Sequence, residues 1–180
     1  MIEKTVTIEV DEQYYKYLST ARGELDTRSE VVMVLPRPGG KILTLTKSVY
    51  PEGTYNLPSG GIHPAESPED AFIREVAEET SLPSSPRERI GFLRRNIVCG
   101  NMSFEFISYI ILGSLTAETP HAVDENENIS GYRDTSITEL RESAAFMLTL
   151  PPYWLNFGKF RSVALELVAD YLVNLPTPLS

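Results

Sequence analysis

The segment from residue 67 to residue 80 constrains the fold of this 180-residue chain more than any other. Ser67 has the side chain of a helix N-cap, and Pro68 follows at the position where a helix best accepts proline. Glu69 and Asp70 then favour the positive end of a helix dipole. These adjacent start signals predict a helix that begins after Ser67 and runs to about Thr80.

The predicted helix has two chemically different faces. At about 100° per residue, one side carries Glu75, Glu78 and Glu79. The neighbouring arc is apolar and consists of Phe72, Ile73, Val76 and Ala77. Like charges at these spacings repel by roughly 0.2–0.5 kcal/mol per exposed pair. A solvated acidic face is the ordinary interpretation, and the alternative is that divalent cations, which prefer oxygen ligands, neutralise the carboxylates.

Segments with strand-like patterns lie on both sides of this helix. The predicted strands are, in chain order, residues 5–10, 31–35, 41–46, 89–98, 103–112 and 129–135. Residues 36–40, Pro-Arg-Pro-Gly-Gly, are expected to turn the chain so that the second and third strands form a hairpin. Further helices are expected over residues 11–21, from the capping box at Ser136 to Glu139, and over the amphipathic segment 153–173. Strands around a central helix predict an α+β fold.

The length favours one domain over residues 1–180, because a single hydrophobic core is comfortable at this size. Outside the central part we expect an N-terminal strand and helix, about residues 1–25, and a C-terminal amphipathic helix, about residues 153–174. Either extension could form a homodimer interface or cap the core.

The charge balance limits the possible partners. Lys and Arg number 16 against 25 Asp and Glu, which gives a net charge of −9. A protein that binds nucleic acid through its phosphates is usually basic, so no nucleic-acid partner is expected. An acidic protein that handles a phosphate-bearing small molecule must reverse its charge locally, with clustered cationic side chains or divalent cations.

The sequence also predicts a location. Cys99 is the only cysteine, so no disulfide can form within the chain. The first residues lack the pattern of a secretory signal, and no apolar run reaches the roughly 18–20 residues of a membrane-spanning helix. We therefore expect a cytoplasmic protein without a membrane partner.

A family resemblance begins at Gly60, where the sequence reads Gly-Gly-Ile-His-Pro-Ala-Glu-Ser-Pro-Glu-Asp-Ala-Phe-Ile-Arg-Glu-Val-Ala-Glu-Glu-Thr-Ser-Leu. This stretch resembles the Nudix box: Gly, five residues, Glu, seven residues, then Arg-Glu-apolar-x-Glu-Glu-x-Gly-apolar. The matching positions are Gly60, Glu66, Arg74, Glu75, Val76, Glu78, Glu79 and Leu82. Ser81 replaces the second glycine, which would end the helix in a left-handed conformation that costs other residues roughly 1 kcal/mol.

The resemblance implies a Nudix fold, in which a mixed β-sheet lies between helices. It implies hydrolysis of a nucleoside diphosphate linked to another moiety, to a nucleoside monophosphate and a phosphorylated remainder, with Mg²⁺ or Mn²⁺. Residues 102–109 and the acidic loop 124–127 are similar to ADP-ribose and nucleotide-sugar pyrophosphatases. The alternatives are a nucleoside triphosphate or dinucleoside polyphosphate hydrolase and a nucleotide-sensing module without turnover. The intact set of box glutamates argues against the sensing module.

The resemblance also implies roles for individual residues. The metal ligands implied are the Gly60 carbonyl and the carboxylates of Glu66, Glu75, Glu78 and Glu79. Catalysis is assigned to Glu75 and Glu78, with Arg74 orienting a glutamate through charge-assisted hydrogen bonds. Some family members take the general base from the box and others from a distant acidic loop, and in this chain the loop candidates are Glu125 and Glu127.

Substrate contacts are harder to predict. Arg37 is a cation available for phosphate, although surface cations usually serve solubility. Rings that could stack on a nucleobase are Tyr14, Tyr15, Tyr55, Phe104 and Tyr132, each of which more often serves packing. From these side chains we select Arg37, Tyr55 and Phe104 as the substrate-binding candidates.

Overall fold

A computed structural model of the chain describes residues 1–20, 28–123 and 125–175. The strands are β1 (Ile2–Glu9), β2 (Ser29–Val34), β3 (Pro36–Arg37), β4 (Lys41–Lys47), β5 (Ser59–Gly61), β6 (Pro86–Cys99), β7 (Met102–Gly113) and β8 (Ile129–Thr135). The helices are α1 (Glu12–Thr20), α2 (Pro68–Thr80), α3 (Ile137–Met147) and α4 (Pro152–Val173), with a short 3-10 helix, η1 (Glu125–Glu127). These elements confirm the predicted α+β fold.

Within the described residues the strands form two sheets. The larger sheet has the order β1-β6-β7-β2-β5, and the smaller sheet has the order β3-β4-β8. The larger sheet is mixed, because β1 runs parallel to β6 and β2 parallel to β7, while the β6–β7 and β2–β5 pairs are antiparallel. Gly60 on β5 is paired with Val31 on β2, so the start of the box is part of the sheet.

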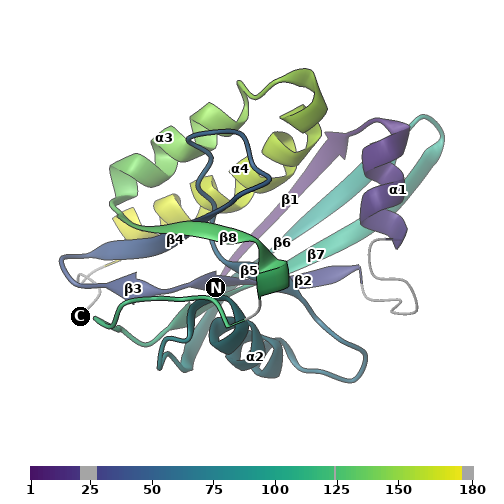
Figure 1. Cartoon of the computed structure of the whole chain (residues 1–180). Coiled ribbons are helices and arrows are strands. Elements are labelled where there is room, and N and C mark those ends of the chain that lie inside the picture. The colour runs from purple at the N-terminus through teal and green to yellow at the C-terminus, as the bar shows by residue number, and fades with distance from the viewer. Residues whose placement is uncertain (21–27, 124, 176–180) are drawn as a thin grey trace.

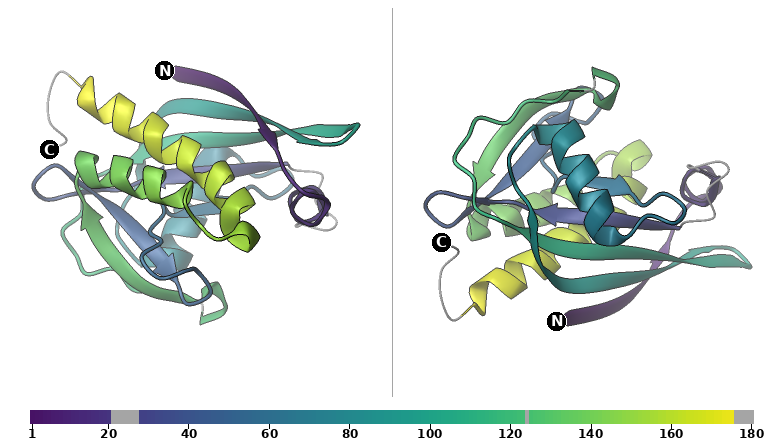
Figure 2. Two further views of the ribbon diagram at one scale, coloured as in Figure 1. Left: turned by 90° about the horizontal axis from the view of Figure 1, so that it is seen from above. Right: turned by 90° about the horizontal axis from the view of Figure 1, so that it is seen from below.

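Helices cover both faces of the larger sheet. The pair α3 and α4 lies on one face and α2 on the other (Figures 1 and 2). Side chains of β2 alternate between these layers: Val32 and Val34 join the core with α3 and α4, whereas Val31 and Met33 join the core with α2. A strand buried on both faces needs a continuous apolar run, which explains the sequence of β2.

The helix α2 begins and ends as its sequence predicts. The Ser67 hydroxyl accepts a hydrogen bond from the Asp70 amide, and proline occupies the first turn. At the other end Ser81 adopts the left-handed conformation, with φ 55°, that the family's glycine would adopt. The capping box that starts α3 at Ser136 is also present.

We expect Ser81→Gly to raise the free energy of unfolding by about 0.5–1 kcal/mol, because glycine adopts a positive φ without a steric penalty. Chemical denaturation of the two proteins would measure the difference. Ser81→Ala is the control, since alanine keeps the steric penalty, and the idea fails if Ala and Gly have the same effect.

The predicted hairpin is present in its turn and wrong in its first strand: the chain turns at residues 38–40, but the strand paired with β4 across this turn is β3, not β2. β2 belongs to the larger sheet and β4 to the smaller one, and Pro36 and Arg37, expected in a turn, form the edge strand β3 paired with β4. An edge strand tolerates proline. The Arg37 guanidinium also fixes this strand, because Nε donates to Asp134 on β8 at 2.8 Å.

The two extensions pack against the central part of the chain. β1 pairs with β6 along its whole length, and α1 lies beside the end of α4 that contains Asn156. The Asn156 amide donates to Asp11 at 2.6 Å, which ties the two segments together. α1 matches the helix expected over residues 11–21, of which Ala21 lies outside the described residues. None of the described helices has both the length and the apolar character needed to cross a membrane.

Candidate active site

Arg74 is the centre of a carboxylate cluster at the side of α2. Its guanidinium donates to Glu66 at 2.9 Å, to Glu75 at 2.6 Å and to Glu78 at 3.3 Å. It also donates to the Gly61 carbonyl at 2.7 Å, which links the helix to β5. One cation therefore gathers three of the box glutamates beside the sheet.

Glu66 is the carboxylate that Arg74 holds most completely. Both carboxylate oxygens accept from Arg74 at 2.9 Å, and one also accepts from the His63 amide at 2.8 Å. The hydrogen bonds from Arg74 lower the pKa of Glu66 to about 2. Glu66 is thus a permanent anion that fixes Arg74, and His63 takes part through its backbone.

Gly60 makes room for Glu75. A β-carbon at position 60 would lie 1.7 Å from the carboxyl carbon of Glu75, far inside any allowed contact. Glu75 is buried, and the absent side chain of Gly60 forms the space in which its carboxylate lies. The box therefore starts with glycine because any other side chain at position 60 would clash with Glu75.

We expect Gly60→Ala to displace the Glu75 carboxylate and to weaken Mn²⁺ binding by about 10–100-fold, the usual cost of disturbing the surroundings of a metal ligand. Titration calorimetry would measure the affinity. Ser59→Ala is the control, because alternate residues of β5 point to the opposite face. Equal affinities for Gly60→Ala and the wild type would contradict the proposed role of this space.

Glu79 is the most buried carboxylate of the helix, with 1% of its surface exposed. One oxygen lies 3.3 Å from the Lys47 ammonium, and the other has no hydrogen-bond partner among the described residues. Burial raises the pKa of Glu79 to about 7. A buried carboxylate with an unpartnered oxygen is costly to a protein unless something positive binds it.

Lys47 connects Glu79 to the acidic loop. Its ammonium donates to Glu127 on η1 at 2.6 Å. Burial lowers the pKa of Lys47, but the nearby carboxylates of Glu79 and Glu127 outweigh burial and raise it above the ordinary value. The loop before η1 is held at the end of α2, where the His121 and Val123 amides donate to helix carbonyls at 2.9 and 3.0 Å. The structure thus brings Glu127 beside Glu79.

Several donors in the cluster fit a divalent cation. The unpartnered Glu79 oxygen and the space that Gly60 leaves for Glu75 provide hard oxygen ligands beside a sheet edge, which Mg²⁺ and Mn²⁺ prefer. In the part of the chain that the structure describes, however, no three His, Cys, Asp or Glu side chains form a ready-made metal cluster. The Arg74 guanidinium lies among Glu66, Glu75 and Glu78 and supplies positive charge to these three carboxylates.

The predicted loop bases differ in their surroundings. Glu127 is half-buried and paired with Lys47, whereas Glu125 is exposed on the same short helix. Asp124 lies outside the described residues. Lys47 itself was missed by the sequence analysis, because nothing near it in the sequence signals a partner 32 residues away in α2.

Two of the three predicted substrate contacts are occupied otherwise. Arg37 is buried, and its guanidinium donates to Asp134, Thr116 and the Glu118 carbonyl, so phosphate would have to break these bonds. Phe104 is buried against Tyr15, with ring centroids 5.1 Å apart. The hydrogen bonds of Arg37 and the packing of Phe104 argue against the substrate contacts predicted for them, which stay predictions.

Tyr55, the third predicted contact, is half-buried. Its ring is covered by the Arg133 guanidinium at 4.2 Å from the centroid. Tyr132, another ring considered above, donates its hydroxyl proton to the Glu79 carbonyl. Tyr132 therefore supports the last turn of α2, while the role predicted for Tyr55 stays a prediction.

Comparison with known proteins gives a consistent result. The family model described as NUDIX domain matches residues 26–151. A NUDIX hydrolase from Nitrosomonas europaea is similar in structure, with 21% identity and a TM-score of 0.55 over 85% of this chain and 93% of that chain. An ADP-ribose pyrophosphatase from Streptococcus suis 89-1591 has 16% identity and a TM-score of 0.52, over 83% and 93%. An Ap4A hydrolase from C. elegans has 13% identity and a TM-score of 0.53, over 82% and 98%. At these identities the three structures establish a shared fold.

Proposed function

Because the chain belongs to the NUDIX domain family and is therefore a pyrophosphohydrolase, we propose that it cleaves a nucleoside diphosphate linked to another moiety. The substrate class is of the ADP-ribose or nucleotide-sugar type, and the products are a nucleoside monophosphate and a phosphorylated remainder. The observation that carries the proposal is the set of box carboxylates, with Glu66, Glu75 and Glu78 gathered on Arg74 next to the buried Glu79.

The chain's own residues divide the work of the reaction. Glu75, Glu79 and the Gly60 carbonyl would hold the divalent cation, and when bound, Mg²⁺ or Mn²⁺ supplies Lewis-acid polarisation of the diphosphate. Glu66 fixes Arg74, and Arg74 in turn orients Glu75 through a charge-assisted hydrogen bond of 2.6 Å. Positioning of the carboxylates before substrate arrives lowers the cost of ordering them during the reaction.

Three carboxylates are candidates for the general base. Glu78 is 45% exposed, so a water molecule can reach its carboxylate. The carboxylate also lies 3.3 Å from Arg74. Glu125 is exposed, whereas the Glu127 carboxylate is engaged by a hydrogen bond of 2.6 Å from Lys47. These surroundings favour Glu78 or Glu125 over Glu127.

The alternative within the enzyme class is a hydrolase of nucleoside triphosphates or dinucleoside polyphosphates. Its support is the structural similarity to an Ap4A hydrolase, at a TM-score comparable to that of the ADP-ribose pyrophosphatase. A sensing module without turnover has less support, because such a module would have no need of a buried carboxylate at position 79 with an oxygen that is unpartnered among the described residues.

Product analysis by liquid chromatography tests the proposal. The protein is incubated with Mg²⁺ and, separately, with ADP-ribose, UDP-glucose, diadenosine polyphosphates and nucleoside triphosphates. We expect AMP and ribose 5-phosphate from ADP-ribose, or UMP and glucose 1-phosphate from UDP-glucose. Preferred cleavage of a triphosphate or dinucleoside polyphosphate would replace the proposal by its alternative, and no cleavage despite calorimetric metal binding would favour a sensing module.

Three further expectations from the sequence remain predictions. They are the single domain over residues 1–180, the cytoplasmic location, and the alternative roles of the two extensions, which either form a homodimer interface or cap the core. The substrate is proposed to be a small molecule, in keeping with the net charge of −9.

A further inference from the structure

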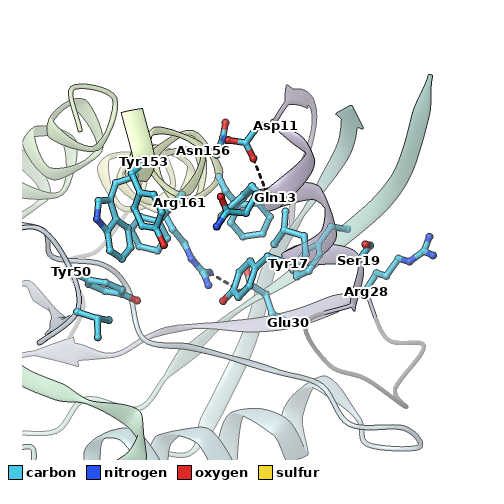
Figure 3. Close-up of a pocket in the computed structure, with 17 residues that line it drawn as sticks. Asp11, Gln13, Tyr17, Ser19, Arg28, Glu30, Tyr50, Tyr153, Asn156 and Arg161 are labelled. Atoms are coloured by element: carbon cyan, nitrogen blue, oxygen red, sulfur yellow. Dashed lines mark hydrogen bonds and ion pairs between the residues drawn. The ribbon is translucent and has the colours of Figure 1, made fainter. Parts of the chain in front are cut away.

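A cavity of about 360 Å³ lies between α1, the start of α4 and the beginning of β2 (Figure 3). It is on the face of the larger sheet that α4 covers, away from α2. Much of its lining is aromatic: Tyr14, Tyr17, Tyr50, Phe106, Tyr153, Trp154, Phe157 and Phe160. Ligand pockets typically have such apolar, aromatic walls and volumes of about 300–1,000 Å³.

Some of these rings pack against one another, and others are largely exposed to solvent. Trp154 packs edge-on against Phe157 with ring centroids 5.5 Å apart, and Tyr50 lies 4.9 Å from Phe157. By contrast, Tyr17 and Tyr153 are 60% and 75% exposed. Large exposed rings beside a preformed cavity are a common feature of sites for planar aromatic groups.

Polar groups converge at one side of the cavity. Glu30 accepts from Arg161 at 2.8 Å, and the Arg161 Nε has no partner among the described residues. Nearby, Asn156 and Asp11 are bonded to each other at 2.6 Å (Figure 3). A few fixed donors and acceptors within aromatic walls suit a planar ring with a hydrogen-bonding edge, as in a nucleobase.

One short segment of the chain, residues 47–50, connects the cavity with the candidate active site. Tyr50 lies in the cavity wall, and its amide donates to the Lys47 carbonyl at 2.9 Å. The ammonium of the same lysine is 3.3 Å from Glu79. Residues 47–50 therefore reach both sites: Lys47 contacts the buried carboxylate, and Tyr50 lines the aromatic cavity.

We propose that this cavity binds the nucleobase of the substrate, with Tyr17 and Tyr153 closing on the ring from α1 and α4. The proposal rests on the function proposed above, to which it adds the part of the protein that recognises the nucleoside. Its volume suits one nucleoside-sized group. Since α1 and α4 lie outside residues 26–151, part of the wall comes from segments that the family model does not match, while Tyr50 and Phe106 lie within the matched residues.

Trp154 makes the test direct, because it is the only tryptophan of the chain and lines the cavity. The intact protein, free of divalent cations, is titrated with adenosine, guanosine, uridine and cytidine while tryptophan fluorescence is recorded. We expect a saturable change with at least one nucleoside and none with ribose 5-phosphate. Tyr17→Ala should weaken that binding by about tenfold, since the base loses an aromatic ring on which it stacks.

A matched control and a kinetic readout complete the test. Phe146 is an exposed ring on α3 outside the cavity, so Phe146→Ala should bind the nucleoside as the wild type does. For the substrate identified by product analysis, Tyr17→Ala should raise KM about tenfold and leave kcat nearly unchanged. An unchanged KM, or no saturable fluorescence change with any nucleoside, would overturn the proposal. Nucleoside binding without turnover would contradict the proposed function and support this site.

Discussion

Glu79→Gln is expected to lower kcat by about three orders of magnitude while leaving the metal-free protein at least as stable as the wild type. Glu79 is buried, and one of its oxygens has no partner among the described residues. Glutamine has nearly the same volume but no charge, so the substitution removes a buried charge together with a metal ligand. The loss of activity would therefore not come from loss of the fold.

Steady-state kinetics and thermal unfolding with and without Mg²⁺ measure the two effects. We expect Mg²⁺ to raise the Tm of the wild type and not that of Glu79→Gln, because a ligand stabilises only the state that binds it. Glu69→Gln is the matched control: Glu69 lies in the first turn of the same helix and bonds to Arg89. More than a tenth of the wild-type kcat in Glu79→Gln would show that this carboxylate is not a metal ligand.

Glu30→Gln is expected to lower the free energy of unfolding by about 3–5 kcal/mol, which corresponds to roughly 10 °C in Tm for a protein of this size. Glu30 is almost fully buried and pairs with Arg161 at 2.8 Å and with Arg95 at 3.7 Å. Its removal leaves the fully buried Arg95 and the 18% exposed Arg161 without an anionic partner among the described residues.

The effect of Glu30→Gln should depend on pH. Burial opposes ionisation of Glu30, but Arg161 and Arg95 lower its pKa below the ordinary 4.5. A lowered carboxylate pKa stabilises the folded state above the unfolded pKa, and this stabilisation is lost as pH falls through the folded value. The difference in Tm between wild type and variant should therefore be full at pH 7 and shrink below about pH 4.5.

Glu105→Gln is the control for this experiment. Glu105 is half exposed and pairs with Arg94 at 3.1 Å, and exposed pairs contribute about 0–1 kcal/mol. Equal Tm changes for Glu30→Gln and Glu105→Gln would contradict the role of the buried network.

The parts of the molecule predicted from the sequence have local causes. Ser67 caps a helix through the Asp70 amide three residues away, and the carboxylates of α2 share a face through spacings of three and four. Strand alternation likewise depends on neighbouring residues. The family resemblance concerns the same segment, and the bounds and the N-cap of α2 were predicted correctly.

The missed parts depend on residues far apart in the chain. Lys47 meets Glu127 80 residues later, and Glu30 meets Arg161 131 residues later, spacings that leave no sequence pattern. Phe104 was selected as a substrate contact, and the structure buries its ring against Tyr15, a contact between distant residues that leaves no pattern in the sequence.

Binding of Mn²⁺, followed by the electron paramagnetic resonance signal of the free ion, tests most directly whether the α2 carboxylates hold a divalent cation. The account predicts saturable binding to the wild type and at least tenfold weaker binding to Glu79→Gln, with Glu69→Gln unchanged. Equal Mn²⁺ affinities for the wild type and Glu79→Gln, or no binding to either at millimolar Mn²⁺, would contradict it.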